Sequence, residues 1–121
     1  MTIETDEFHS QLINDIKKHI HQNIKDKPTP GSICIISGYS RFYMQRLFRK
    51  ATGKSIGEYI NDVRLHQIRE LLINTNMTVT SISTEFHYES STQLTKRFKE
   101  KYGLPPRQYR KKYLSSPTSA E

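Results

Sequence analysis

The sequence predicts an all-α protein of about seven helices, arranged as two helix-turn-helix subdomains that are joined by one long linker helix. Apolar residues recur at helical spacings, no segment alternates with period two for long, and the chain repeats itself after about 50 residues. Its 121 residues allow one domain or two small lobes. The expected boundaries are 7–53 for the first subdomain, 54–76 for the linker helix, 77–114 for the second subdomain and 115–121 for a disordered tail.

Three helices are expected in the first subdomain. A helix over 7–24 is predicted by one apolar stripe, which contains Phe8, Leu12, Ile13, Ile16, Ile20 and Ile24. A short helix over 31–37 follows two prolines, and Gly38 then provides a tight turn. Ser40 is a good N-cap for a third helix, which ends at Gly53.

A capping box at Ser55 and Glu58 predicts the start of the long linker helix. Its apolar stripe consists of Ile56, Tyr59, Ile60, Val63, Ile68, Leu71 and Leu72. A helix of about 18 to 20 residues is roughly 27 to 30 Å long. Successive major grooves on one side of B-DNA are about 34 Å apart, so such a helix suits one chain that spans two grooves.

The second subdomain has the same kinds of helix-starting and helix-ending residues as the first. Thr78 can cap a helix with apolar residues Val79, Ile82 and Phe86. Ser90 opens a helix that ends at Gly103, and two prolines open a final helix. When the chain is aligned with itself at a shift of 50 residues, an N-cap, two core positions, a basic residue, a helix-ending glycine and a tyrosine match. The matched pairs are Ser40 with Ser90, Met44 with Leu94, Arg46 with Lys96, Phe48 with Phe98, Gly53 with Gly103 and Tyr59 with Tyr109. Each half is therefore a short helix, a tight turn and a basic helix.

Positive charge is concentrated in these two basic helices and their surroundings. The formal net charge is +7. Residues 38–54 contain five bases and no acid, and residues 90–112 contain eight bases and one acid, whereas the rest of the chain is net acidic. Two separate surfaces for a polyanion are therefore expected.

The outward faces of the two basic helices carry side chains that suit double-stranded DNA. Arg46 can donate two hydrogen bonds to guanine, and Gln45 can read adenine. Thr92 and Thr95 can contact a thymine methyl group or donate a hydroxyl, and Lys96 and Lys99 suit phosphate or guanine. The predicted DNA-binding residues are Ser40, Arg41, Phe42, Gln45, Arg46, Arg49, Lys50, Ser90, Ser91, Thr92, Thr95, Lys96, Lys99 and Arg107. Because the two sets differ, the expected site is asymmetric and is bound by a monomer.

Three stretches resemble the AraC/XylS family of bacterial transcription activators, especially its small stand-alone members of the MarA/SoxS kind: Ser37 to Gly53, Glu58-Tyr-Ile60, and Phe98 to Tyr109 with its Gly-Leu-Pro-Pro-Arg-Gln-Tyr ending. The resemblance covers about residues 7–113. It implies seven helices and binding to promoter DNA through Phe42, Gln45 and Arg46 and through Ser91, Thr92, Thr95 and Lys96. It also implies recruitment of RNA polymerase and a location in the bacterial cytoplasm, at the nucleoid.

Two positions depart from the family pattern. His87 stands where relatives usually have glycine in the second turn, and histidine tolerates a left-handed backbone better than most residues. Ile35 and Ile36 replace polar residues and form an apolar patch that could be a partner surface. The chain has no room for the ligand-binding domain of longer relatives, so no small-molecule effector is expected.

Other classes of function find little support. No paired acid and base, nucleophile or metal-ligand spacing is present, so we expect no enzyme activity, no cofactor and no metal. The single Cys34 reads as a small packing residue. No apolar run is long enough to cross a membrane. A nonspecific or architectural DNA-binding protein is the main alternative, and a membrane-surface or adaptor protein is a weaker one. Both leave Gln45, Thr92 and Thr95 without a role.

Overall fold

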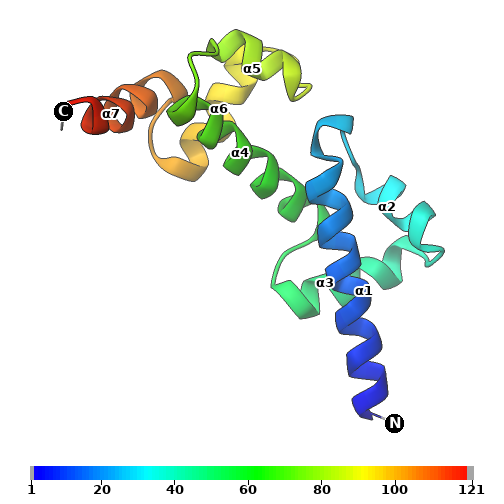
Figure 1. Cartoon of the computed structure of the whole chain (residues 1–121). Coiled ribbons are helices and arrows are strands. Elements are labelled where there is room, and N and C mark those ends of the chain that lie inside the picture. Colours follow the sequence, from blue (N-terminus) through cyan, green and yellow to red (C-terminus); the bar gives the residue numbers. More distant parts are fainter. Residues whose placement is uncertain (1, 120–121) are drawn as a thin grey trace. The chain divides into compact units, whose positions relative to one another are not determined.

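The computed structural model describes the backbone of residues 2–119 and the side chains of residues 8–35 and 37–113. Within these ranges it contains α-helices, one short 3-10 turn and no strand, so the all-α prediction is confirmed (Figure 1). In chain order the elements are α1 (Thr2–Gln22), η1 (Ile24–Asp26), α2 (Pro30–Ser37), α3 (Arg41–Thr52), α4 (Ile56–Asn74), α5 (Val79–Glu85), α6 (Ser91–Tyr102) and α7 (Pro106–Ser119).

The chain divides into two compact units, Met1–Val63 and Arg64–Glu121. The boundary lies within α4, so the helix that the sequence suggested as a separate linker contributes its first part to one unit and its second part to the other. Each unit contains one short helix followed by one basic helix, namely α2 and α3 in the first unit and α5 and α6 in the second.

The first unit has a core that α1, α2, α3 and the start of α4 share. Its buried side chains are Ile13, Ile16, Ile20, Ile24, Ile33, Cys34, Met44, Phe48, Ile56, Ile60 and Val63. Phe8 was expected in the stripe of α1 but is 53% exposed, and Ile13 is the first buried residue among the described side chains of this helix. Cys34 packs in this core, as expected, and burial raises the pKa of its thiol.

The second unit buries the later part of α4 against α5, α6 and α7. Its core consists of Leu65, Ile68, Leu72, Val79, Ile82, Ser83, Phe86, Leu94, Phe98, Pro106 and Tyr109. Leu65 was left out of the predicted stripe, although its spacing of three and seven residues from Ile68 and Leu72 places it on the same helix face. Ser83 in α5 is 3% exposed and Cys34 in α2 is 6% exposed, so the short helix of each unit buries a small residue.

Side-chain caps start the basic helices where the sequence predicts. The Ser40 hydroxyl accepts a hydrogen bond from the Tyr43 amide at 3.2 Å, and the Ser90 hydroxyl accepts one from the Gln93 amide at the same distance. Gly53 and Gly103 end the two helices with left-handed backbone, at φ 80° and 85°. The two halves therefore use the same local signals for the same purpose.

The turn before each basic helix also has left-handed backbone. Gly38 has φ 80° and His87 has φ 65°. The second turn therefore places a residue with a side chain in a conformation that favours glycine. This confirms the sequence-based expectation for His87.

The helix α7 continues to Ser119, beyond the expected end at residue 114. The side chains of residues 114–121 lie outside the described residues, as does the backbone of residues 120 and 121. Disorder of residues 115–121 therefore stays a prediction.

Candidate DNA interface

The helix α3 presents most of its predicted DNA-binding side chains to solvent. Those of Ser40, Arg41, Phe42, Arg46, Arg49 and Lys50 are exposed, and that of Gln45 is half-buried. Phe42 is 73% exposed although it is aromatic. The guanidinium of Arg46 lies 5.8 Å from the centre of the Phe42 ring, a cation–π distance that holds both side chains on one face of the helix. The exposed cations of this face can attract a polyanion.

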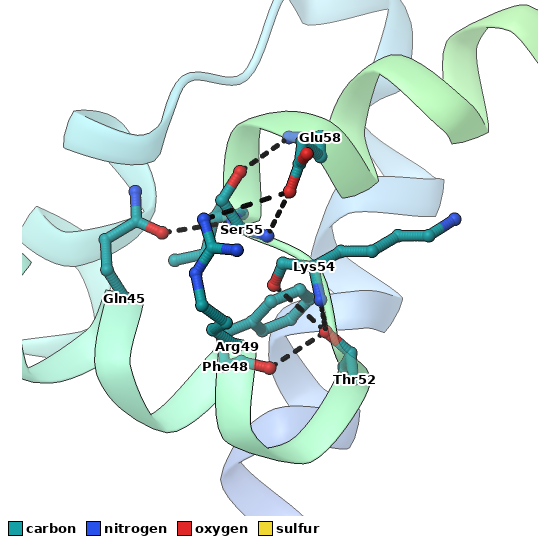
Figure 2. A network of polar contacts seen from close by, with 8 residues as sticks. Gln45, Phe48, Arg49, Thr52, Lys54, Ser55 and Glu58 are labelled. Carbon is teal, nitrogen blue, oxygen red and sulfur yellow. Dashed lines mark hydrogen bonds and ion pairs between the residues drawn. The ribbon is translucent and has the colours of Figure 1, made fainter.

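Polar contacts connect α3 to the start of α4 (Figure 2). The Ser55 amide donates to Glu58 Oε1 at 2.8 Å and the Glu58 amide donates to Ser55 Oγ at 3.1 Å, which confirms the capping box. The hydrogen bond from the Ser55 amide lowers the pKa of the Glu58 carboxyl. Arg49 lies 3.9 Å from that carboxylate, and both side chains are mostly exposed.

Gln45 belongs to the same network, which the sequence did not suggest. Its Oε1 accepts a hydrogen bond from the Ile56 amide at 3.1 Å, so this side chain contacts α4 as well as the exposed face of α3 (Figure 2). Lys54 forms an ion pair with Asp62, and this hydrogen bond raises the pKa of the Lys54 ammonium. One base of the first positive segment is therefore neutralised within its own unit.

The helix α6 carries the second set of predicted residues. Ser90, Thr92, Lys96 and Lys99 are exposed, whereas Ser91 and Thr95 are half-buried. Arg107 is exposed on the first turn of α7. The structure thus brings six of these seven residues together on one helix and its cap. That they contact DNA stays a prediction, as it does for α3.

Two arginines of the second unit have structural contacts that the sequence did not reveal. Arg110 Nε donates to the Leu72 carbonyl at 2.8 Å, and its Nη2 donates to the carbonyls of Met77 at 2.6 Å and Thr75 at 3.3 Å. Arg69 Nε donates to the Tyr109 hydroxyl at 2.8 Å. These bonds join α7 to the end of α4, where helix carbonyls lack partners within the helix. Arg110 therefore connects α7 to the end of α4 and the residues that follow it, although its position in a run of basic residues suggested an exposed charge.

A pair of aromatic rings supports each basic helix from inside. The ring centres of Phe48 and Tyr59 are 5.3 Å apart at an angle of 76°, and those of Phe98 and Tyr109 are 5.3 Å apart at 85°. Both pairs are edge-to-face, an arrangement that aromatic rings favour. The three-dimensional structures of the two halves therefore repeat in detail.

Among the side chains described, no group of three potential metal ligands comes together. No helix in the described part of the chain is both long and apolar enough to cross a membrane. Ile35 is 82% exposed, as the predicted apolar patch requires, whereas the side chain of Ile36 lies outside the described residues.

Comparison with known proteins decides the family. A helix-turn-helix domain family matches residues 33–112. The chain is 34% identical over 104 residues to the HTH-type transcriptional activator AarP of Providencia stuartii, covering 86% of this chain and 77% of that protein. It is 32% identical over 98 residues to the multiple antibiotic resistance protein MarA of Escherichia coli, covering 81% and 77%. The chain belongs to the AraC/XylS family of helix-turn-helix transcriptional regulators.

Solved structures share the fold of this AraC-type chain. An AraC-type transcriptional regulator from Chromobacterium violaceum matches with a TM-score of 0.82 at 20% identity, covering 88% of this chain and 96% of that one. The DNA-binding domain of AdpA, solved in complex with a target DNA, matches with a TM-score of 0.79 at 19% identity, covering 85% and 93%. The family is one of DNA-binding regulators and not of enzymes.

Proposed function

We propose that this AraC-type chain is a transcription activator that binds an asymmetric promoter site as a monomer, with α3 and α6 in adjacent major grooves. Bound beside a promoter, it recruits RNA polymerase. It acts where promoter DNA is, in the bacterial cytoplasm at the nucleoid.

The observation that carries the proposal is the presence of two similar but non-identical basic helices in one chain. Each begins at a serine N-cap and ends at a left-handed glycine. Each exposes cations and hydrogen-bonding side chains to solvent and buries one phenylalanine in its own unit. Because the two basic helices differ, each binds a different half-site, and a symmetric dimer is not required. The relatives named as activators support the regulatory outcome.

Selection of bound duplexes from a random DNA pool, followed by footprinting, tests the proposal. We expect one selected sequence without two-fold symmetry, with protection over about two helical turns. A palindromic selected site would contradict monomeric binding. Transcription from a promoter that carries the selected site should rise when the protein and RNA polymerase are both added, and unchanged transcription would contradict activation.

A nonspecific architectural protein is the second candidate, because the exposed cations alone would attract any duplex. The two functions differ in their salt dependence and selectivity. An activator of this kind should bind its selected site at least about a thousandfold more tightly than random DNA at physiological salt. Equal affinity for both would favour the architectural protein. Binding to anionic vesicles without binding to DNA would favour the membrane-surface alternative.

A further inference from the structure

A hollow on the surface of the first unit lies where α1 packs against α3 (Figure 1). It is partly open to solvent and has a volume of about 420 Å³. Ile13 and Leu47 supply apolar lining, and polar or cationic side chains lie around them. The residues of that second group are His9 and Ser10 on α1 and Tyr43, Arg46 and Lys50 on α3. The sequence did not indicate this hollow, because α2 separates its two sides along the chain.

The hydroxyl of Tyr43 in this hollow has a partner on the other helix. It lies 3.0 Å from His9 Nε2, and this hydrogen bond joins α3 to α1. The centre of the Tyr43 ring lies 5.2 Å from that of Tyr39 and 6.4 Å from that of His9. These contacts hold the tyrosine in one position, although the residue is 36% exposed.

Tyr43 and Lys50 lie on the side of α3 next to its predicted base-reading face. Each helical residue turns about 100°, so Tyr43 points to one side of Phe42, and Lys50, two turns later, points the same way as Tyr43. An α-helix with its side chains is about 10 to 12 Å in diameter, and the major groove is about 12 Å wide. A helix in the groove therefore has a sugar-phosphate wall on each side. When α3 reads bases with Phe42 and Arg46, the hollow faces one of these walls.

We propose that Tyr43, positioned by His9, donates a hydrogen bond to one backbone phosphate of DNA beside the groove that α3 reads. A phosphodiester oxygen can only accept, so the Tyr43 hydroxyl must turn its proton to the phosphate. Its own oxygen then accepts from His9 Nε2, which must carry a proton in this arrangement. Lys50 adds a positive charge beside the phosphate, and Ile13 and Leu47 suit the C–H groups of the adjoining deoxyribose. The inference rests on the proposed function, since it needs α3 in a major groove.

The second unit has different groups at the equivalent positions of α6. A shift of 50 residues pairs Tyr43 with Gln93 and Lys50 with Glu100. The Oε1 atom of Gln93 accepts a hydrogen bond from the Glu89 amide at 3.0 Å. The carboxylate of Glu100 repels a phosphate, whereas the ammonium of Lys50 attracts one. The arrangement of tyrosine and lysine is therefore particular to the first unit.

Methylphosphonate scanning of the selected duplex tests the contact. Each modified duplex has a methyl group in place of one charged phosphate oxygen, so it loses one acceptor and one charge. Wild-type affinity should fall at least about tenfold at one phosphate beside the half-site of α3, as expected for a hydrogen bond to a charged group. Tyr43→Phe should bind the unmodified duplex about tenfold more weakly. It should also lose less affinity than wild type at that one phosphate, with equal losses at all others.

Further variants separate the phosphate contact from base reading and from the role of His9. A phosphate contact carries no sequence information, so Tyr43→Phe should select the same sequence as wild type from a random pool. His9→Gln keeps a donor in the place of Nε2 and should bind as wild type does, whereas His9→Leu should bind more weakly. In a chain that already carries Tyr43→Phe, His9→Leu should cause no further loss. Tyr113→Phe is the matched control, because it removes a hydroxyl from an exposed tyrosine of the second unit and should leave affinity unchanged.

Three outcomes would overturn the inference alone: equal losses for wild type and Tyr43→Phe at every phosphate, a changed selected sequence for Tyr43→Phe, or equally weak binding by His9→Gln and His9→Leu. The losses are compared within each protein, so a change in stability does not imitate the expected result. A wild-type chain that selects no sequence would overturn the proposed function and this inference together.

Discussion

The two units have the same aromatic pair but surround it differently. In the first unit, the Tyr59 hydroxyl lies 3.0 Å from His21 Nε2, and the Lys17 ammonium lies 5.9 Å from the centre of its ring. In the second unit, the ring of Tyr109 lies near two further aromatic rings, with its centre 5.7 Å from that of Tyr102 and 4.4 Å from that of Tyr113, and its hydroxyl accepts a hydrogen bond from Arg69. The repeat thus preserves the core and the caps, whereas polar partners are particular to each unit.

The largest effect is expected from truncating the central phenylalanine of either unit. Phe48 and Phe98 are both 0% exposed, but Phe98 also contacts Tyr102, at 4.7 Å between ring centres. Phe98→Ala should cost about 3 to 5 kcal/mol of unfolding free energy, and Phe48→Ala should lie near the lower end of that range. Denaturant unfolding gives the free energies, and amide hydrogen exchange identifies the unit that opens. A folded Phe98→Ala protein that has lost only DNA binding would place Phe98 at the surface.

The next effect concerns the arginine that joins α7 to α4. Arg110→Lys keeps the charge but cannot reach the carbonyls of Leu72, Thr75 and Met77 together, so it should cost about 2 to 3 kcal/mol of stability. In the first unit the Arg49–Glu58 contact is mostly exposed, so Arg49→Lys should cost less than about 1 kcal/mol. Thermal unfolding of both variants checks this contrast. Equal stability of the two variants would show that Arg110 is only a surface charge.

DNA binding should distinguish a base-reading side chain from a phosphate-binding one. Arg46→Ala should cost about 1 to 3 kcal/mol at the selected site and relax the preference at one base, with little change on random DNA. Lys99→Ala should weaken both kinds of DNA and reduce the salt slope by about one. Binding titrations at several salt concentrations measure both. If Arg46→Ala lost as much affinity for random DNA as for the selected site, Arg46 would not contact a base. If Lys99→Ala left the salt dependence of binding unchanged, Lys99 would not contact a phosphate.

A smaller effect is expected at the turns, where one unit has glycine and the other has histidine. His87→Gly should stabilise the protein by about 1 kcal/mol, because it removes the strain of a left-handed non-glycine residue. Gly38→Ala should have the opposite sign and a similar size. Denaturant unfolding of the two single variants is the measurement. A loss of stability in His87→Gly would mean that contacts of the histidine side chain outweigh its backbone strain.

The smallest effect is a pH dependence that comes from the capping box of Ser55 and Glu58 in the first unit. The lowered pKa of Glu58 means that its stabilising contribution is present above the unfolded-state pKa and is lost as the pH falls through the folded-state pKa. Glu58→Gln should therefore differ from wild type most near neutral pH and least in acid. The repeat partner is Gln108, which has no charge to titrate. Melting temperatures against pH at low salt test this, and parallel curves for both proteins would contradict it.

Local signals made the fold readable from the sequence. Ser40, Ser90, Gly53 and Gly103 act within a few residues of their own position, so spacing alone predicts where the basic helices begin and end. Burial followed from helical periodicity in the same way. Phe8 was misplaced because a stripe shows which face of a helix is apolar but does not show where a neighbouring helix covers it.

The polar roles in the candidate site were less predictable, because they depend on residues that are distant along the chain. Gln45 accepts a hydrogen bond from an amide 11 positions later, and Arg110 donates hydrogen bonds to carbonyls more than 30 positions earlier. Nothing in the spacing of Arg110 separates it from the other bases of its segment. For Gln45 a signal did exist, because the repeat pairs Ile56, which has an amide hydrogen, with Pro106, which has none.

Native mass spectrometry of the full chain on a duplex with the selected site, combined with footprinting, tests most directly whether one chain uses both basic helices. We predict one protein chain per duplex and protection in two neighbouring major grooves, with Arg46→Ala removing protection in one groove and Lys96→Ala in the other. Two chains per duplex, or protection of a single groove, would contradict the account.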